Sequence, residues 1–115
     1  MKKLGLLFLI VSAAGFAQGG DAAAGKQLWM KYSCYSCHGY TADGGTGPRL
    51  AKTKFNEKGL ITYVRNPPRP EQMPSYSEKV LKDQELSNIY AYLQTLSAGK
   101  ALKDVPLLQQ MPKQQ

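Results

Sequence analysis

The sequence has few of the residues that cross-link small exported domains or hold metal ions in them. Its 115 residues include one histidine, His38, and two cysteines, Cys34 and Cys37. A Cys/His zinc site needs about four ligands, so this chain cannot complete one. A disulfide between two cysteines only three positions apart would close too small a loop to stabilise the fold much. The thiols and the imidazole are therefore left for another chemistry.

Long apolar runs are also missing. The apolar run at residues 4–17 has 14 residues, whereas a helix needs about 20 to span a bilayer. Lys2 and Lys3 precede this run, and Gly15-Phe16-Ala17 ends it as a small-x-small cleavage site. No cysteine follows directly, which disfavours a lipoprotein. We expect residues 1–17 to be a cleaved secretory signal peptide and the mature chain to be a soluble periplasmic protein; an uncleaved anchor is the alternative that the short run disfavours.

The segment Cys34-Tyr35-Ser36-Cys37-His38 predicts covalent attachment of haem. Two thiols at this spacing can add across the two vinyl groups of a haem, and the next imidazole then lies under the iron. A thioredoxin-like redox pair would instead need a βαβ setting, and residues 25–45 show no such pattern. We therefore expect one haem c, with thioether bonds to Cys34 and Cys37 and with His38 as the proximal iron ligand.

Residues 18–99 are predicted to form one all-α domain, followed by a C-terminal tail at residues 100–115. Asp21 is expected to cap a first helix in which Gly25 and Trp29 share one face, with a close approach at Gly25. A second helix is predicted to start at the cap Asn56, with Phe55 packed on Leu60, and to end before Pro67. The last helix is predicted at residues 83–98, with Asp83 as its cap and Gly99 after its end.

The second axial ligand has to come from somewhere other than histidine, because the chain has only one. Met30 is too close to Cys34 to reach the opposite face of a haem. Met73 lies in a loop with prolines at positions 68, 70 and 74, which lower the entropic cost of holding a weak thioether ligand. We expect Met73 to be the distal ligand; Met111 in the tail, a lysine or an open site are lesser alternatives.

The charge balance of the chain is basic. The full chain carries a net charge of +7. Five cations fall between the haem motif and Met73 and could form an electrostatic docking face; the simpler interpretation is a basic surface that keeps the protein soluble. These cations are Lys52, Lys54, Lys58, Arg65 and Arg69. A nucleic-acid partner is not expected, because no basic motif is interleaved with aromatic residues.

Together these motifs resemble the class I c-type cytochromes, over a stretch from about Asp21 to Leu96. The resemblance implies the class I cytochrome c fold, with three to four short helices wrapped around one covalently attached haem. It also implies that the first and last helices cross, with Gly25 and Trp29 facing Tyr92 and Leu93. In the Gly47-Pro48-Arg49-Leu50 segment, it implies that the Pro48 carbonyl accepts a hydrogen bond from His38 and that Arg49 pairs with a haem propionate.

The function implied by this resemblance is single-electron transfer between redox proteins that dock at the haem edge, by Fe(II)/Fe(III) cycling and without enzymatic activity of its own. The run from Val64 to Pro74 also resembles haem subunits of periplasmic dehydrogenases, so a tightly bound subunit is the first alternative. The second alternative is an open-site haem protein that binds ligands. Peroxidase chemistry is disfavoured because the chain has no second histidine to act as acid or base.

Overall fold

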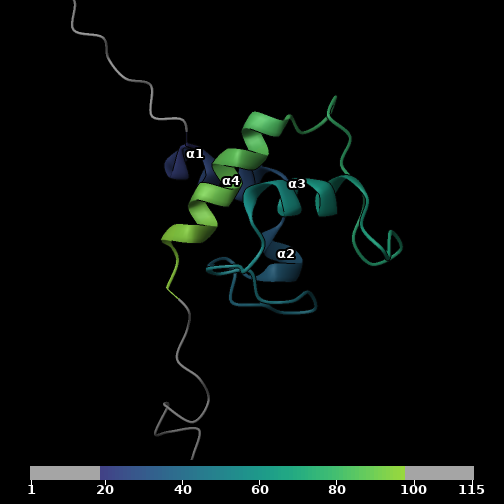
Figure 1. The fold of residues 1–115 in the computed structure, drawn as a ribbon. Helices are drawn as coiled ribbons and strands as arrows, with labels where there is room; N and C mark the ends of the chain where they lie inside the picture. The colour runs from purple at the N-terminus through teal and green to yellow at the C-terminus, as the bar shows by residue number, and fades with distance from the viewer. Residues whose placement is uncertain (1–18, 98–115) are drawn as a thin grey trace, which may run out of the picture.

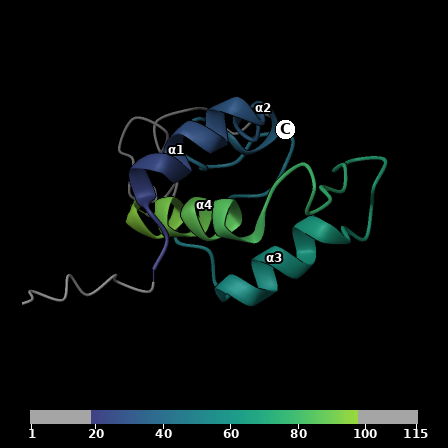
Figure 2. The same cartoon turned by 90° about the horizontal axis from the view of Figure 1, so that it is seen from above.

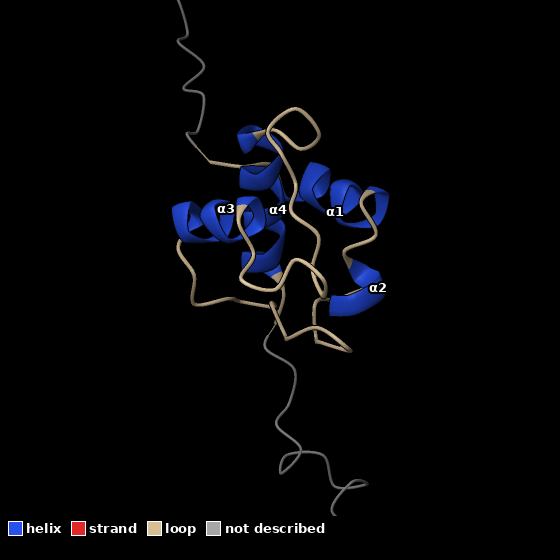
Figure 3. Cartoon of the chain, turned by 90° about the vertical axis from the view of Figure 1, so that its right-hand side faces the viewer, coloured by secondary structure: helices blue, strands red, loops and turns tan. Residues whose placement is uncertain are grey.

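The computed structural model describes residues 19–97, which form four helices and no strand. The helices are α1 (Ala22–Lys31), α2 (Tyr35–His38), α3 (Glu57–Arg65) and α4 (Asp83–Thr95), with loops between them (Figures 1 and 3). The all-α prediction is therefore confirmed for this part of the chain. The predicted signal peptide at residues 1–17 and the predicted tail at residues 100–115 lie outside the described residues.

The packing of α1 on α4 is the main helix contact of the domain (Figure 2). Asp21 caps α1 as predicted, because its Oδ1 accepts hydrogen bonds from the main-chain N–H groups of Ala23 and Ala24. Gly25 is buried, and a Cβ atom built on it would lie 1.9 Å from the carbonyl oxygen of Asn88. Only glycine allows the two backbones to approach this closely.

The expected contact of Trp29 with Tyr92 is confirmed, whereas Gly25 contacts other residues of α4 than expected. The ring of Trp29, which is 2% exposed, lies edge-on to Tyr92 with a centroid separation of 6.2 Å. Gly25 instead meets Asn88 and Ile89, one turn before Tyr92 in α4. Gly25 stands one turn before Trp29, and its neighbours Asn88 and Ile89 stand one turn before Tyr92, so the two contacts are offset by one turn along both helices.

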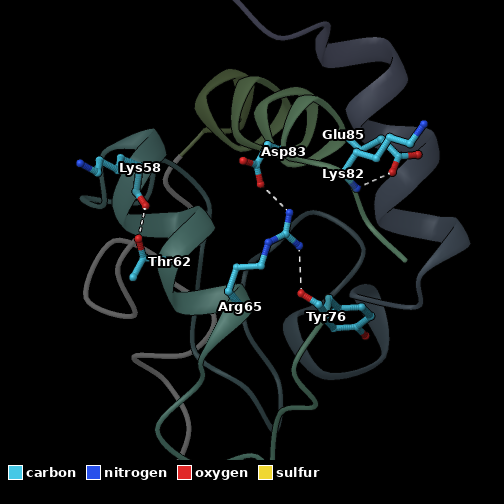
Figure 4. Close-up of polar contacts among 7 residues, drawn as sticks. All are labelled: Lys58, Thr62, Arg65, Tyr76, Lys82, Asp83 and Glu85. Atoms are coloured by element: carbon cyan, nitrogen blue, oxygen red, sulfur yellow. Dashed lines mark hydrogen bonds and ion pairs between the residues drawn. The ribbon is translucent and has the colours of Figure 1, made fainter. Parts of the chain in front are cut away.

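The cap of α4 differs from the prediction. Lys82, not Asp83, is the N-cap residue, and its main-chain N–H donates to Glu85 Oε2 over 2.8 Å (Figure 4). Lysine has no acceptor oxygen for capping, so the carboxylate of Glu85 satisfies this end of the helix from the third helical position. Asp83 points to Arg65 instead. The helix ends at Thr95, before the predicted residue 98, and Gly99 lies outside the described residues.

Helix α3 starts and ends as predicted. Asn56 Oδ1 accepts a hydrogen bond from the N–H of Gly59 over 2.7 Å, and the helix stops at Arg65 because the next residue precedes a proline. Leu60 and Val64 are buried. Phe55 remains 44% exposed, with its ring tilted against that of Tyr63 at 5.7 Å.

The core lies between α1, α3 and α4. Its largest fully buried side chains are Trp29, Leu81, Leu86 and Leu93. The loops that connect α2 to α3 and α3 to α4 complete the wall of the domain on the side of α2 (Figures 1 and 3). Within residues 19–97, no helix is long and apolar enough to cross a membrane.

Candidate functional site

The Cys-x-x-Cys-His segment forms a single helical turn, which directly follows α1 and lies against the core. Ser33 has a φ of 57°, so the chain turns sharply between α1 and α2. The N–H of Cys34 then bonds to the Trp29 carbonyl (3.1 Å), and the N–H of His38 bonds to the Cys34 carbonyl (3.0 Å). Cys34 is half-buried and Cys37 is exposed. Burial raises the pKa of the free Cys34 thiol to about 11, so this thiol is neutral near pH 7.

The imidazole of His38 is buried and held in one orientation. Its Nδ1 atom lies 2.7 Å from the carbonyl oxygen of Pro48, and a carbonyl can only accept, so Nδ1 carries the proton. In the neutral tautomer with this proton, the lone pair is on Nε2. Nε2 has no hydrogen-bond partner among the described residues, and no fully buried side-chain nitrogen or oxygen in that region lacks one. Nε2 therefore faces accessible space, as a metal ligand would need to.

Gly47 and Trp29 enclose the imidazole. A Cβ atom on Gly47 would lie 2.9 Å from His38 Cε1 and 3.0 Å from Nδ1, so this position has no room for a side chain. The Trp29 ring lies 6.0 Å from the imidazole ring, and its Nε1–H donates to the carbonyl of Gly39 over 3.0 Å. The loop after α2 is thus fastened to α1 at the residue that follows His38.

A cavity of about 790 Å³ lies against His38. Cys34, His38, Pro48 and Met73 all line it, although they come from three separate segments of the chain. Most of the remaining wall is apolar, and includes Leu50, Leu60, Val64, Leu86, Ile89 and Leu93. Its volume is in the range of ligand and cofactor sites. A large apolar disc bonded to a thiol in the wall, with a nitrogen ligand available at Nε2, fits this cavity and its donors.

Met73 is the only predicted distal candidate among the described residues that the structure places at the cavity. Its side chain is half-buried, and its main-chain N–H donates to the Arg69 carbonyl over 2.9 Å. Met30 projects from α1, is 40% exposed and does not line the cavity. Met111 lies outside the described residues. The structure therefore brings Met73 to the same cavity as His38 and keeps Met30 away from it.

Arg49, which the resemblance predicts to pair with a haem propionate, is paired with Asp43 in the structure. Its guanidinium pairs with Asp43 at 3.2 Å, and both side chains are well exposed. The hydroxyl of Thr41 donates to the other oxygen of Asp43 over 2.7 Å. These contacts, first that of Thr41 and then that of Arg49, hold the pKa of Asp43 below its ordinary value of 3.8. The pair is a surface ion pair, of a kind that contributes little to stability.

The predicted basic face needs one correction. Lys52, Lys54, Lys58 and Arg69 are exposed. Arg65 is not available to a docking partner, because its side chain is only 17% exposed and pairs with Asp83. Its basic residue type was visible in the sequence, but its pairing depends on the fold.

Sequence reasoning also missed Tyr76, which lines the cavity three residues after Met73. Its ring packs edge-on against Tyr32 with a centroid separation of 6.2 Å, and burial raises the pKa of its phenol. The short spacing from Met73 was the available signal, because a residue three positions along a tight loop stays near the same cavity.

The chain matches the model of a known protein family. The family model described as "Cytochrome C oxidase, cbb3-type, subunit III" matches residues 20–93. The matched stretch contains the Cys-x-x-Cys-His segment, Pro48 and Met73. No curated protein and no solved structure matches the chain.

Proposed function

The chain belongs to the family described as cytochrome c oxidase, cbb3-type, subunit III, and is thus a c-type cytochrome; from this premise we propose that it is a periplasmic single-haem electron carrier. Membership supports a haem-based electron-transfer protein with covalently bound haem c and with proteins as redox partners. The finer proposal names one haem, bonded to Cys34 and Cys37 and ligated by His38 and Met73. The main support for this proposal is that Cys34, His38 and Met73 line the same cavity.

When bound, the haem supplies one-electron chemistry, by alternation of its iron between the Fe(II) and Fe(III) states. The protein's part is to hold the ligands. The Nδ1–H group of His38 donates a hydrogen bond to the Pro48 carbonyl. This bond fixes the tautomer of the ring and makes Nε2 more basic, and therefore a stronger ligand for a metal ion. Met73 contributes a neutral thioether, and the apolar wall excludes water. A neutral ligand and a dry cavity both favour the reduced, less charged state.

Arg49 is proposed as a partner of a haem propionate. Its present partner Asp43 is exposed, and exposed ion pairs contribute little to stability. Exchanging Asp43 for another carboxylate therefore costs little. Arg49 does not itself line the cavity, but it stands between Pro48 and Leu50, which do, and the carbonyl of Pro48 contacts His38.

The surface over which electrons would pass is proposed to be the edge of the cavity at Phe55 and Tyr63. Both rings line the cavity and are also exposed, at 44% and 37%. Lys54 directly precedes Phe55, Lys58 follows it by three residues after Asn56 and Glu57, and both lysines are exposed. An apolar centre with a basic surround suits brief contacts with acidic redox proteins, and such contacts weaken as salt concentration rises.

A second candidate is a haem subunit held permanently by a larger redox enzyme, such as a periplasmic dehydrogenase. It is favoured by the description of the matched family, which names a subunit of an oxidase. The two candidates differ in how the protein behaves at high salt. A free carrier would purify alone, whereas a fixed subunit would stay bound to a second polypeptide in 1 M salt. At this salt concentration the Debye length is about 3 Å, so contacts held only by surface charges are lost.

The test of the distal ligand is an optical and redox titration of the haem-loaded protein beside two variants. Met73→Ala should abolish the weak far-red ferric band that marks a methionine–iron bond, and should lower the midpoint potential. Met30→Ala is the matched control, since Met30 is exposed and lies away from the cavity. It should leave both readings unchanged. A Met73→Ala protein with the wild-type ferric spectrum would refute the assignment.

A further inference from the structure

Arg65, the last residue of α3, joins three parts of the domain. Its Nη1 atom donates to the main-chain carbonyl of Tyr76 over 2.9 Å, and its Nη2 atom donates to Asp83 Oδ1 over 2.5 Å. Figure 4 shows the guanidinium between these two oxygens, with one contact on each arm of its fork. The side chain is 17% exposed, so water competes less for these contacts than it does at a surface pair.

The Tyr76 contact divides the loop between α3 and α4. This loop runs over residues 66–82 and carries Met73. The N–H of Tyr76 donates to the Val64 carbonyl over 3.1 Å, so both main-chain polar groups of Tyr76 are bound to the last two residues of α3. Residues 66–75 thereby form a closed segment that begins and ends at α3. Closing a loop in this way removes conformations that an open loop would sample.

Met73 lies three residues before the closing contact. On its other side, its N–H is bonded to the Arg69 carbonyl, and prolines at 67, 68, 70 and 74 restrict the backbone further. The prolines stiffen the segment, but they do not attach it to the rest of the domain. Attachment near Met73 comes from Tyr76, by one hydrogen bond from a neutral main-chain group and one from the charged Arg65. Hydrogen bonds from charged donors are the stronger kind.

We infer that Arg65 is a positioning residue, which holds the loop so that Met73 stays on the cavity. This inference rests on the proposed ligation by Met73. It replaces the role expected from the sequence, in which Arg65 was one of several docking charges. It also explains the pairing of Asp83: the carboxylate fixes the guanidinium at the start of α4, and the guanidinium then holds the Tyr76 carbonyl.

The experiment measures how easily an added ligand displaces Met73. Imidazole is titrated into the ferric haem-loaded protein, and binding is followed by absorbance. An external ligand binds only when the loop releases the iron, so a looser loop raises the apparent affinity. Removing a hydrogen bond from a charged donor changes an equilibrium by roughly tenfold to a hundredfold. Arg65→Met should raise the affinity for imidazole by that factor. Lys58→Met, which removes a charge from the exposed side of the same helix, should not change it.

The same titration in the Met73→Ala protein shows whether Arg65 acts by positioning Met73 or only by keeping the cavity closed. With no thioether to displace, adding Arg65→Met should leave the affinity for imidazole within about twofold. An equal rise in both backgrounds would overturn the inference, because it would mean that Arg65 only closes the cavity. The inference would also be overturned if Arg65→Met did not raise the affinity for imidazole in the protein that keeps Met73. If Met73→Ala itself leaves the ferric spectrum unchanged, the proposed ligation fails and the inference falls with it, which is a distinct result.

Two milder variants cover the case in which Arg65→Met does not fold. Asp83→Asn keeps the contact of Arg65 with Tyr76, and Arg65→Lys keeps the charge but lacks the fork. Each should raise the affinity for imidazole by less than Arg65→Met. Amide hydrogen exchange gives a reading that does not depend on the iron: exchange at Met73 and Tyr76 should be faster in these variants, and that at the centre of α4 unchanged. Wild-type exchange and affinity in both variants would contradict the inference.

Discussion

Replacing Gly25 with alanine should force α1 and α4 apart at their crossing. The added Cβ atom would lie 1.9 Å from the Asn88 carbonyl oxygen, 2.5 Å from its carbonyl carbon and 2.9 Å from the Ile89 nitrogen. All three are backbone atoms, so no side-chain rotation relieves the contact. The shortest distance is 1.5 Å short of the 3.4 Å at which ordinary contact begins, so the helices must move by about that amount.

Two opposing effects set the size of the change. Alanine is favoured over glycine inside a helix by about 1 kcal/mol. Overpacking a well-filled core costs about 1–3 kcal/mol, and a clash between two backbones belongs at the top of this range. The expected net loss is about 2 kcal/mol. For a domain of this size, this corresponds to a fall in Tm of roughly 8–16 °C.

The assay is denaturant and thermal unfolding of the haem-loaded protein, with Gly59→Ala as control. Gly59 also lies inside a helix, but the atoms near its added Cβ belong to side chains: Asn56 Oδ1 at 3.0 Å and Phe55 Cδ1 at 3.4 Å. The gain in helix propensity and the disturbance of the Asn56 cap should roughly cancel, leaving a change within about 1 kcal/mol. If Gly25→Ala proves as stable as Gly59→Ala, the close packing of α1 on α4 is wrong.

Three further changes test other parts of the site. Gly47→Ala should crowd the His38 imidazole, lowering the stability by about 1–3 kcal/mol and altering the absorption spectrum of the haem-loaded protein; a spectrum identical to wild type would contradict the observed proximity. Thr41→Val should raise the pKa of Asp43 toward 3.8, measured by NMR of the side-chain carboxyl. Since the pKa of Asp43 is lower in the folded protein, its carboxylate stabilises the fold above the unfolded pKa, and this effect is lost as pH falls through the folded pKa. An unchanged pKa of Asp43 in the variant would count against the Thr41 contact. Lys54→Glu should slow oxidation by ferricyanide, a small anion, at low salt, and the difference should vanish near 1 M salt; equal rates at low salt would remove this lysine from the docking surface.

The helices were predictable because their signals are local. Asp21 and Asn56 are acceptor side chains directly before helical stretches, and both cap as expected. A proline after Asn66 was enough to end α3. Lys82 shows the limit of this reasoning. The cap at α4 comes from Glu85, and Asp83 was free to pair with a residue 18 positions away, which local pattern does not reveal.

The meeting of Cys34, His38 and Met73 at one cavity was predictable because these are rare residue types in this chain, whereas their bonds to a haem stay a prediction. With one histidine and a Cys-x-x-Cys pair, few assignments were open, and Met73 stood out by its loop. The role of Arg65 was not predictable, because a basic residue at the end of a helix has the same local pattern whether it faces solvent or a carbonyl. Gly25 was expected to meet a close neighbour, but the identity of that neighbour, Asn88, depends on how α1 and α4 pack together in the folded domain.

The central claim is that a single haem is bonded to Cys34 and Cys37. Intact mass spectrometry of the protein from an oxidising, haem-loading host tests it most directly, after denaturation has removed any group held without a covalent bond. We expect the mass of the polypeptide plus one haem, with peptides that retain the haem at both cysteines and with loss of this mass in a Cys34→Ser, Cys37→Ser protein. The bare polypeptide mass, with two free thiols, would contradict it.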